Sequence, residues 1–345
     1  MSKAVKSNDP SMTISQTDTT ELNFDWEADK IVVKTGSETN LLQLARRDPH
    51  IKSAYQQLLS KDYIFYMHSL GKSYFIRRAL IKTIWKRTDL VQYGDTFYTV
   101  TPVAPNKVNQ LAPLRLCVIF SSMPGPKEYY SPNVAERMFV QNYPSLAKHL
   151  VKNTLILRIM DLNRNFGTYY MNTENYPTFE DDVQGIILQV MADHDIDADD
   201  VVLYGGSKGG SGALYHSILG NYHAVVVDPI FSQTNYWQGD HDVHFTQGYL
   251  PEKLLATYQA ALTAYPNTRE KTIIGTPQVR VNYDEYLKLD SPLVHIYHVF
   301  DDHIQKHPDV SANSTIEQVT LMNQYLLSSP NLLKLQAAED QRFMK

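Results

Sequence analysis

The chain has 345 residues, of which 43% are hydrophobic and 20% charged, as in an ordinary globular protein. Its net charge of −5 argues against a broad nucleic-acid surface, because the phosphate backbone favours a basic face. No apolar run approaches the roughly 18 residues of a membrane-spanning helix, and the N-terminus lacks a hydrophobic signal segment. We therefore expect a cytoplasmic protein that binds no nucleic acid. The single cysteine, Cys117, predicts a buried thiol rather than a disulfide.

The first part of the chain predicts a polar leader followed by a small α+β region. Residues 1–20 are polar and predict a disordered segment. Residues 21–105 contain two strand-like runs, "KIVVKTG" and "DTFYTVTP", and helical runs that break near Asp48 and Pro49. The run "SYFIRRALIKTIWKRT" predicts a basic amphipathic helix. Docking on the protein is its ordinary role, and binding to an anionic surface is the alternative.

Residues 106–345 alternate between strand-like and helical runs, which predicts a doubly wound, mostly parallel sheet with right-handed crossovers. The strand-like runs are "LRLCVIFSS", "TLILRIMD", "VVLYGG" and "HAVVVDP". Two further runs, "QVRVNYDEY" and "LVHIYHVF", are expected to be the last strands, before a closing helix. Residues 231–270 interrupt the alternation and predict a lid insertion above the sheet.

The segment Gly205-Gly206-Ser207-Lys208-Gly209 joins a strand-like run to a helical run. It fits G-x-S-x-G, the nucleophile elbow of an α/β hydrolase. Larger residues two positions before or after the serine would clash with the strand and the helix. The helix start offers the Lys208 amide to a developing oxyanion, and Ser122 lies where a second donor is expected. The order Ser-Lys-Gly does not fit a phosphate-binding loop, so a plain glycine-rich turn is the alternative.

A serine nucleophile needs a histidine base and an acid that orients it, and in α/β hydrolases both follow the serine in the sequence. We prefer His303 as the base because it directly follows the run "LVHIYHVF", and His307 is its rival. Asp284 keeps the order Ser, Asp, His if "QVRVNYDEY" is the strand before the last. The other candidate acids are Asp301, Asp302 and Asp228. The ordinary role of Asp228 would be to cap the turn after its strand.

Two further clusters invite a binding role. His241, Asp242 and His244 could ligate a metal, but no second group of ligands is evident, so we expect polar surface and no metal. Arg158 lies in the predicted strand "LILRIM", and Arg164 lies in the segment "DLNRNFGTYYMN" that follows it. They could pair with a phosphate or carboxylate, or they could anchor a structural loop.

Several of these segments together resemble the capsular polysaccharide biosynthesis proteins of the XcbB/CpsF type. The segments are "VIFSSMP", "LRIMDLNRNFGTYYMNT", "VVLYGGSKGGSGALYHSILGNYHAVVVDP" and the "DDH" sequence, and the similarity spans about residues 114–310. The family is also distantly similar to the accessory Sec-system component that O-acetylates glycans. The resemblance implies an α/β-hydrolase-like serine enzyme, with Ser207 as the nucleophile.

The activity implied by the resemblance is O-acetylation of a capsular polysaccharide or oligosaccharide, with acetyl-CoA as co-substrate. An acetyl group would move through Ser207 to a sugar hydroxyl. The aromatic residues of the insertion, among them Tyr236, Trp237 and Tyr249, would hold the acceptor and exclude water. The resemblance also implies peripheral association with the capsule assembly machinery at the inner membrane. The alternatives are a carbohydrate esterase or deacetylase with the same triad, and a non-catalytic scaffold of capsule assembly.

Overall fold

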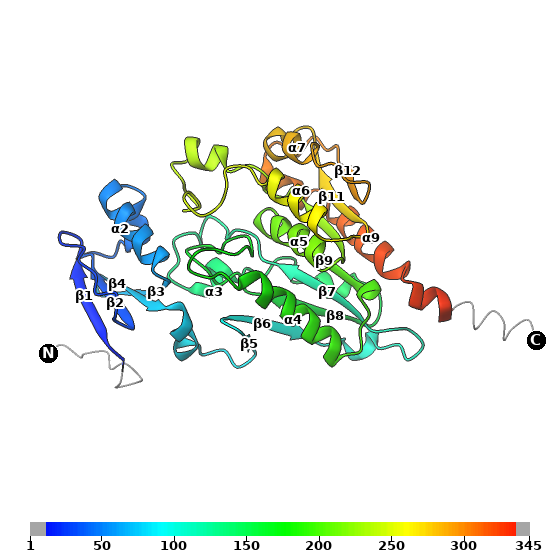
Figure 1. Cartoon of the computed structure of the whole chain (residues 1–345), viewed down its shortest axis with the longest axis horizontal. Coiled ribbons are helices and arrows are strands. Elements are labelled where there is room, and N and C mark those ends of the chain that lie inside the picture. Colours follow the sequence, from blue (N-terminus) through cyan, green and yellow to red (C-terminus); the bar gives the residue numbers. More distant parts are fainter. Residues whose placement is uncertain (1–11, 336–345) are drawn as a thin grey trace, which may run out of the picture. The chain divides into compact units, whose positions relative to one another are not determined.

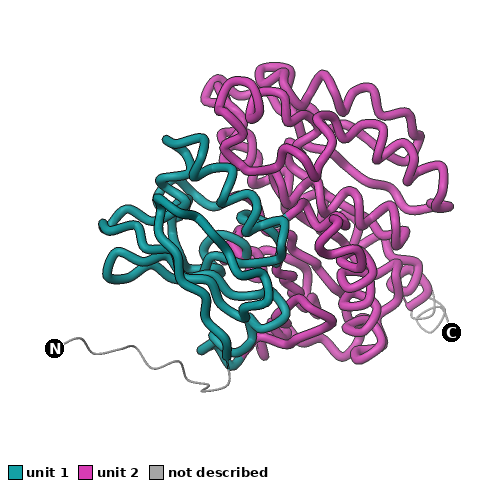
Figure 2. The backbone as a smooth tube through the Cα atoms, turned by 60° about the vertical axis from the view of Figure 1, so that its left-hand side comes forward, with its two compact units in different colours: residues 1–88, 124–138, 162–167 teal, residues 89–123, 139–161, 168–345 magenta. Residues whose placement is uncertain are grey.

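The structure is a computed structural model that describes residues 12–335 (Figure 1). The chain divides into two compact units (Figure 2). The smaller unit contains the described residues up to Thr88 together with Pro124–Met138 and Leu162–Gly167. The larger unit contains Asp89–Met123, Phe139–Asp161 and the described residues from Thr168 onward.

The smaller unit is built on a four-stranded sheet with the order β1-β2-β4-β3. Its elements are β1 (Ile14–Asp18), β2 (Lys30–Lys34), α1 (Leu41–Ala45), α2 (Pro49–Ser60), β3 (Tyr63–Ser69), β4 (Lys72–Arg77), the 3₁₀ helix η1 (Arg78–Ile84) and α3 (Val134–Met138). Asp48 accepts hydrogen bonds from the first amides of α2, and Pro49 is its first residue, so the helices break where the sequence predicts. Buried Arg137 donates to the carbonyl of Phe65 at 2.5 Å and so holds α3 in this unit.

Two predictions for this region are wrong. Residues 14–18 of the predicted disordered leader form β1, which pairs in parallel with β2. Residues 1–11 of that leader lie outside the described residues. The predicted basic helix is instead the strand β4 followed by η1, because Tyr74, Phe75 and Ile76 pair with both β2 and β3.

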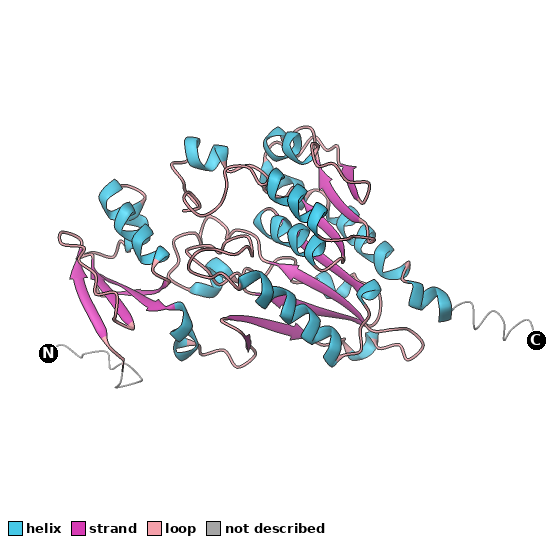
Figure 3. Cartoon of the chain, viewed as in Figure 1, coloured by secondary structure: helices cyan, strands magenta, loops and turns pink. Residues whose placement is uncertain are grey.

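The larger unit is built on an eight-stranded sheet with the order β12-β11-β10-β9-β7-β8-β6-β5. Figure 3 distinguishes the helices from the strands by colour. Its strands are β5 (Val91–Tyr93), β6 (Thr96–Thr101), β7 (Arg115–Phe120), β8 (Thr154–Ile159), β9 (Val201–Gly206), β10 (His223–Val227), β11 (Lys271–Gly275) and β12 (Val294–His298). All neighbours from β12 to β8 pair in parallel, and β6 pairs antiparallel with both β8 and β5.

Helices cover both faces of this sheet. The α-helices of the larger unit are α4 (Phe179–Asp193), α5 (Lys208–Leu219), α6 (Leu255–Ala264), α7 (Arg280–Tyr286), α8 (His307–Ala312) and α9 (Thr315–Leu327). Its short helices are η2 (Pro105–Lys107), η3 (Leu146–Lys148), η4 (Ala198–Asp200) and the π-helical turn η5 (Asn235–Gly239). Val118 and Phe120 of β7 pack in the core with α4, α5 and α6, whereas Cys117 and Ile119 pack in the core with α8 and α9. The predicted class, an α/β fold with a doubly wound, mostly parallel sheet, is confirmed, and Cys117 is buried.

The structure departs from the predicted boundaries at three places. The larger unit begins at Asp89 rather than at 106, because β5 and β6 extend its sheet. The interruption of the alternation ends before Leu255, because α6 is the helix that connects β10 to β11 and packs in the core. The predicted strand "QVRVNYDEY" is mainly the helix α7, and the strand at this place in the sheet is β11, the fully buried run "KTIIG".

Within residues 12–335, no helix combines the length and the apolar character that crossing a membrane would require.

Lys271, the first residue of β11, is a buried lysine whose charge affects the stability of the fold. It is fully buried, and its ammonium donates to the carbonyl of Arg269 at 2.7 Å. Burial, and then the charge of Arg269, lower the pKa of Lys271 to about 7. The unfolded chain therefore binds more protons than the folded chain between about pH 7 and pH 10, and stability rises with pH across this window.

We expect Lys271→Met to be more stable than the wild type at pH 7 by about 2 kcal/mol, because the buried charge is removed. The difference in the free energy of unfolding should shrink toward pH 10, because deprotonating Lys271 on folding costs less free energy as the pH approaches the pKa of lysine in the unfolded chain. Urea unfolding of both proteins across this pH range measures it. A difference that does not change with pH would contradict the expectation.

Candidate active site

The turn between β9 and α5 is a strained elbow with Ser207 at its tip. Ser207 has φ 55° and ψ −125°, which L-residues rarely adopt, and its amide donates to the carbonyl of Val227 at 2.9 Å. A Cβ on Gly205 would lie 2.2 Å from the carbonyl oxygen of Gly209, and one on Gly209 would lie 2.3 Å from that of Phe120. Glycine is therefore required on both sides of the serine, as the G-x-S-x-G pattern predicts.

Two short hydrogen bonds connect Ser207 to a histidine and an aspartate. The Nε2 of His307 lies 2.7 Å from the Oγ of Ser207, and its Nδ1 lies 2.6 Å from the Oδ2 of Asp228. A carboxylate can only accept, so Nδ1 carries the proton and Nε2 accepts from the serine hydroxyl. Asp228 is buried directly after β10, and His307 begins α8 beyond β12. This is the geometry that a serine nucleophile, its base and its orienting acid require.

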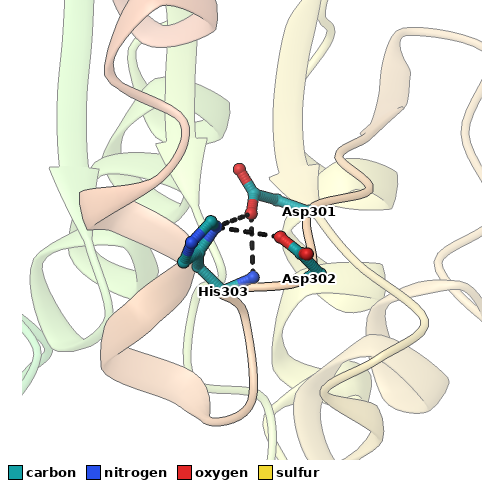
Figure 4. Close-up of side chains that lie close together, drawn as sticks. All are labelled: Asp301, Asp302 and His303. Atoms are coloured by element: carbon teal, nitrogen blue, oxygen red, sulfur yellow. Dashed lines mark hydrogen bonds and ion pairs between the residues drawn. The ribbon is translucent and has the colours of Figure 1, made fainter.

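The structure brings His307 to Ser207 rather than the preferred candidate His303. His303 is 78% exposed, and its Nδ1 lies 2.8 Å from Asp301 and 2.9 Å from Asp302, as Figure 4 shows. The hydrogen bond that His303 donates to Asp301, and then the charge of Asp302, raise the pKa of His303. His303 lies in the loop after β12 with its side chain exposed, whereas His307 is the first residue of α8, the helix that follows this loop.

The preferred acid, Asp284, also lies elsewhere. It is on the helix α7, where it forms an exposed ion pair with Arg280 at 3.1 Å. Its assignment depended on reading α7 as a strand. The position beside the histidine is taken instead by Asp228, which sequence reasoning had named only as a further candidate. The available signal was its place at the carboxyl end of β10, the strand next to that of the nucleophile.

The two predicted oxyanion donors differ in availability. Lys208 is the first residue of α5, where the amides have no partner within the helix. The amide of Ser122 donates to the Oδ1 of Asn142 at 2.9 Å, so Ser122 is not a free donor in this structure. The amide of Ser121 is likewise bound, to the hydroxyl of Tyr170 at 2.7 Å. The next amide is that of Met123, for which no hydrogen bond is found within residues 12–335.

The side chain of Lys208 has a structural partner that sequence reasoning missed. Its ammonium lies 2.7 Å from the Oδ2 of Asp161, and both side chains are fully buried. Asp161 also accepts from the amide of Thr168 at 2.9 Å, and the ammonium lies over the ring of Tyr170. Burial lowers the pKa of Lys208, and Asp161 opposes this effect. The pair ties the elbow to the loop after β8.

The segment between β10 and α6 lies close to Asp228. Burial, and then the charge of Asp228, raise the pKa of Tyr236, whose ring packs 4.1 Å from that of His244. The indole of Trp237 donates to the hydroxyl of Thr246 at 2.8 Å. Tyr249 packs against the core of the larger unit. Their predicted role in holding an acceptor remains a prediction.

The other polar clusters have structural contacts. Asp242 accepts from the amides of Thr246 and Gln247, and so caps a turn. Arg158 donates to the carbonyl of Asn142 at 2.9 Å. Asp301, Asp302 and His303 bring ligand atoms within 4.8 Å of one another, but they are largely exposed side chains of one loop.

The strand order, the elbow and the carboxyl-end placement of the three side chains define an α/β-hydrolase-like fold carrying a Ser-His-Asp arrangement. No protein-family model and no curated protein matches the sequence.

Among solved structures, the chain is similar to the capsule O-acetyltransferase of Neisseria meningitidis serogroup A at 13% identity and a TM-score of 0.48, covering 68% of this chain and 94% of that one. A mutant of that enzyme has been solved in complex with CoA. The chain is also similar to an S-formylglutathione hydrolase of Agrobacterium tumefaciens at 11% identity and a TM-score of 0.44, covering 69% and 100%.

A third similarity is to the Glycosylation Associate Protein (Gap123) complex of Streptococcus agalactiae, at 14% identity and a TM-score of 0.45. The similarity covers 68% of this chain but only 45% of that chain, so this protein spans less than half the length of the Gap123 chain. Similarities at this level assign neither an activity nor a substrate to the chain.

Proposed function

We propose that this protein is a serine O-acetyltransferase of capsular polysaccharide biosynthesis. It would move acetyl from acetyl-CoA through acetyl-Ser207 to a sugar hydroxyl. The observation that carries the proposal is the pair of hydrogen bonds from Ser207 through His307 to Asp228 on a strained elbow. The resemblance to proteins of the XcbB/CpsF type supports the capsule as the source of the acceptor. It also supports a cytoplasmic site of action, at the capsule assembly machinery.

The chemistry follows from the three side chains. As the Oγ of Ser207 attacks the thioester carbonyl, its proton passes to the Nε2 of His307, and Asp228 stabilises the imidazolium. The tetrahedral intermediate collapses, the carbon–sulfur bond breaks, and His307 returns the proton to the CoA thiolate. A sugar hydroxyl then attacks the acetyl ester while His307 takes its proton and passes it to Ser207. We propose the amides of Lys208 and Met123 as the oxyanion donors.

An intact-mass measurement after incubation with acetyl-CoA tests the proposal. We expect the wild type to gain one acetyl group and Ser207→Ala to gain none, because the ester forms on the Oγ of Ser207. Adding a capsular oligosaccharide should then discharge the acetyl group onto the sugar.

Two other outcomes would replace the proposal. Release of acetate from an acetylated polymer without acetyl-CoA would identify an esterase with the same three residues. Absence of both reactions from a folded wild-type protein would favour a scaffold of the assembly machinery.

A further inference from the structure

The carboxylate of Asp228 has a second oxygen that does not face the histidine. Its Oδ2 binds His307, and its Oδ1 lies 3.4 Å from the hydroxyl of Tyr286, which donates to it. Tyr286 is the last residue of α7 and is 1% exposed. The buried carboxylate is therefore contacted from both sides, by the imidazole on one oxygen and by a phenol on the other.

The backbone around Tyr286 leaves room for its hydroxyl to reach this place. A Cβ on Gly275, the last residue of β11, would lie 1.8 Å from the hydroxyl oxygen of Tyr286. The ring is held by Phe231, at 5.8 Å between centroids, and by Tyr283, at 5.5 Å. The strand end and the two aromatic neighbours hold the hydroxyl beside Asp228.

The hydroxyl of Tyr286 can only act as a donor toward Asp228. Burial, and then the negative charge of Asp228, raise the pKa of Tyr286 far above its ordinary value. Because a carboxylate oxygen can only accept, the phenol proton is directed to Asp228. The distance of 3.4 Å is long for such a bond. Hydrogen bonds at catalytic sites are often long before substrate binds and shorten as charge develops.

Asp228 sits on a strained stretch of backbone. Asp228 has φ 38°, outside the regions that L-residues prefer, and its amide donates to the carbonyl of Ile274 at 2.8 Å. The two oxygens of its carboxylate are contacted by Tyr286 and His307. A rotation that moved Oδ2 away from His307 would leave the imidazolium without its stabilising partner.

We propose that Tyr286 is a positioning residue that holds the Asp228 carboxylate against His307. The inference depends on the catalytic role proposed for Ser207, His307 and Asp228, but not on the identity of the acyl donor or the acceptor. It can therefore be tested with an activated acetyl ester such as p-nitrophenyl acetate, which reports acylation of Ser207 whatever the natural substrate is.

The test compares Tyr286→Phe with Tyr283→Phe. Tyr283 lies one turn earlier on the same helix, and its hydroxyl bonds to exposed His298 at 3.0 Å. For Tyr286→Phe we expect kcat to fall about tenfold or more with little change in KM, since a hydrogen bond to a charged group is lost. For Tyr283→Phe we expect kcat to stay within about twofold of the wild type.

A second measurement separates positioning from a general loss of folding. In the wild type, the Nδ1 proton of His307 lies between nitrogen and carboxylate, so its NMR resonance should be far downfield. Tyr286→Phe should shift or broaden this resonance, and Tyr283→Phe should leave it unchanged. This readout requires no turnover.

The outcomes distinguish this inference from the proposed function. If Ser207→Ala reacts with the ester as fast as the wild type does, the catalytic role of the serine is wrong. If Ser207 is required but Tyr286→Phe keeps both its kcat and its resonance, Tyr286 does not position Asp228. A lower kcat with an unchanged resonance and a lower unfolding temperature would show a purely structural role, and it would also overturn the inference.

Discussion

His307→Ala is expected to lower kcat/KM for acetyl transfer by about 10⁴-fold or more, because the serine loses the group that takes its proton. His303→Ala is expected to leave kcat/KM within about twofold, since His303 is 78% exposed and its imidazole contacts Asp301 and Asp302 in its own loop. Steady-state kinetics of the two purified variants, with matched unfolding temperatures, measure the contrast. Equal losses in both variants would contradict the assignment of His307 as the base.

A second pair of variants tests which aspartate orients the histidine. Asp228→Asn is expected to lower kcat by about 10⁴-fold. The amide N–H of asparagine can donate to Nδ1 of His307, which favours the tautomer that carries its proton on Nε2 and cannot accept the proton of Ser207. Asp284→Asn is its matched control, since Asp284 forms an exposed ion pair with Arg280 on α7. A strong loss in Asp284→Asn would restore the acid that the sequence alone favoured.

Lys208→Met is expected to destabilise the fold by about 3–5 kcal/mol, because it leaves the Asp161 carboxylate buried without its partner. Both side chains are fully buried, and the ammonium and the carboxylate are 2.7 Å apart. Urea unfolding of the wild type and the variant measures the change. The double variant Lys208→Met with Asp161→Leu should recover most of the loss, because it removes both buried charges together.

The exposed ion pair of α7 supplies the control for this prediction. Arg280 and Asp284 form a similar contact at 3.1 Å, but their side chains are 76% and 44% exposed. Arg280→Met should therefore change the stability by no more than about 0.5 kcal/mol. If the double variant Lys208→Met with Asp161→Leu is as unstable as Lys208→Met alone, the elbow is stabilised by packing of the aliphatic part of Lys208 and not by pairing of its buried charge.

Much of the larger unit could be predicted because its signals are local. The runs that became β7, β8, β9 and β10 are mostly apolar and largely buried, as is typical of parallel strands covered on both faces. The run "QVRVNYDEY" misled because Val279, Val281 and Tyr283 alternate like a strand. In the fold this segment is α7, which buries Asn282, Glu285 and Tyr286 on one helical face. The short run "KTIIG" already fills the place in the sheet.

The elbow and its candidate nucleophile could be predicted from the sequence alone. The glycines around Ser207 are adjacent in sequence to the strand and helix that require them, so the pattern can be recognised without the fold. The histidine and the aspartate that meet the serine could be identified from the three-dimensional structure but not from local patterns, because His307 lies 100 positions from Ser207 and 79 from Asp228. Such contacts depend on the path of loops between strands. The same holds for the Lys208 side chain, whose partner Asp161 lies 47 positions away, after a different strand of the sheet.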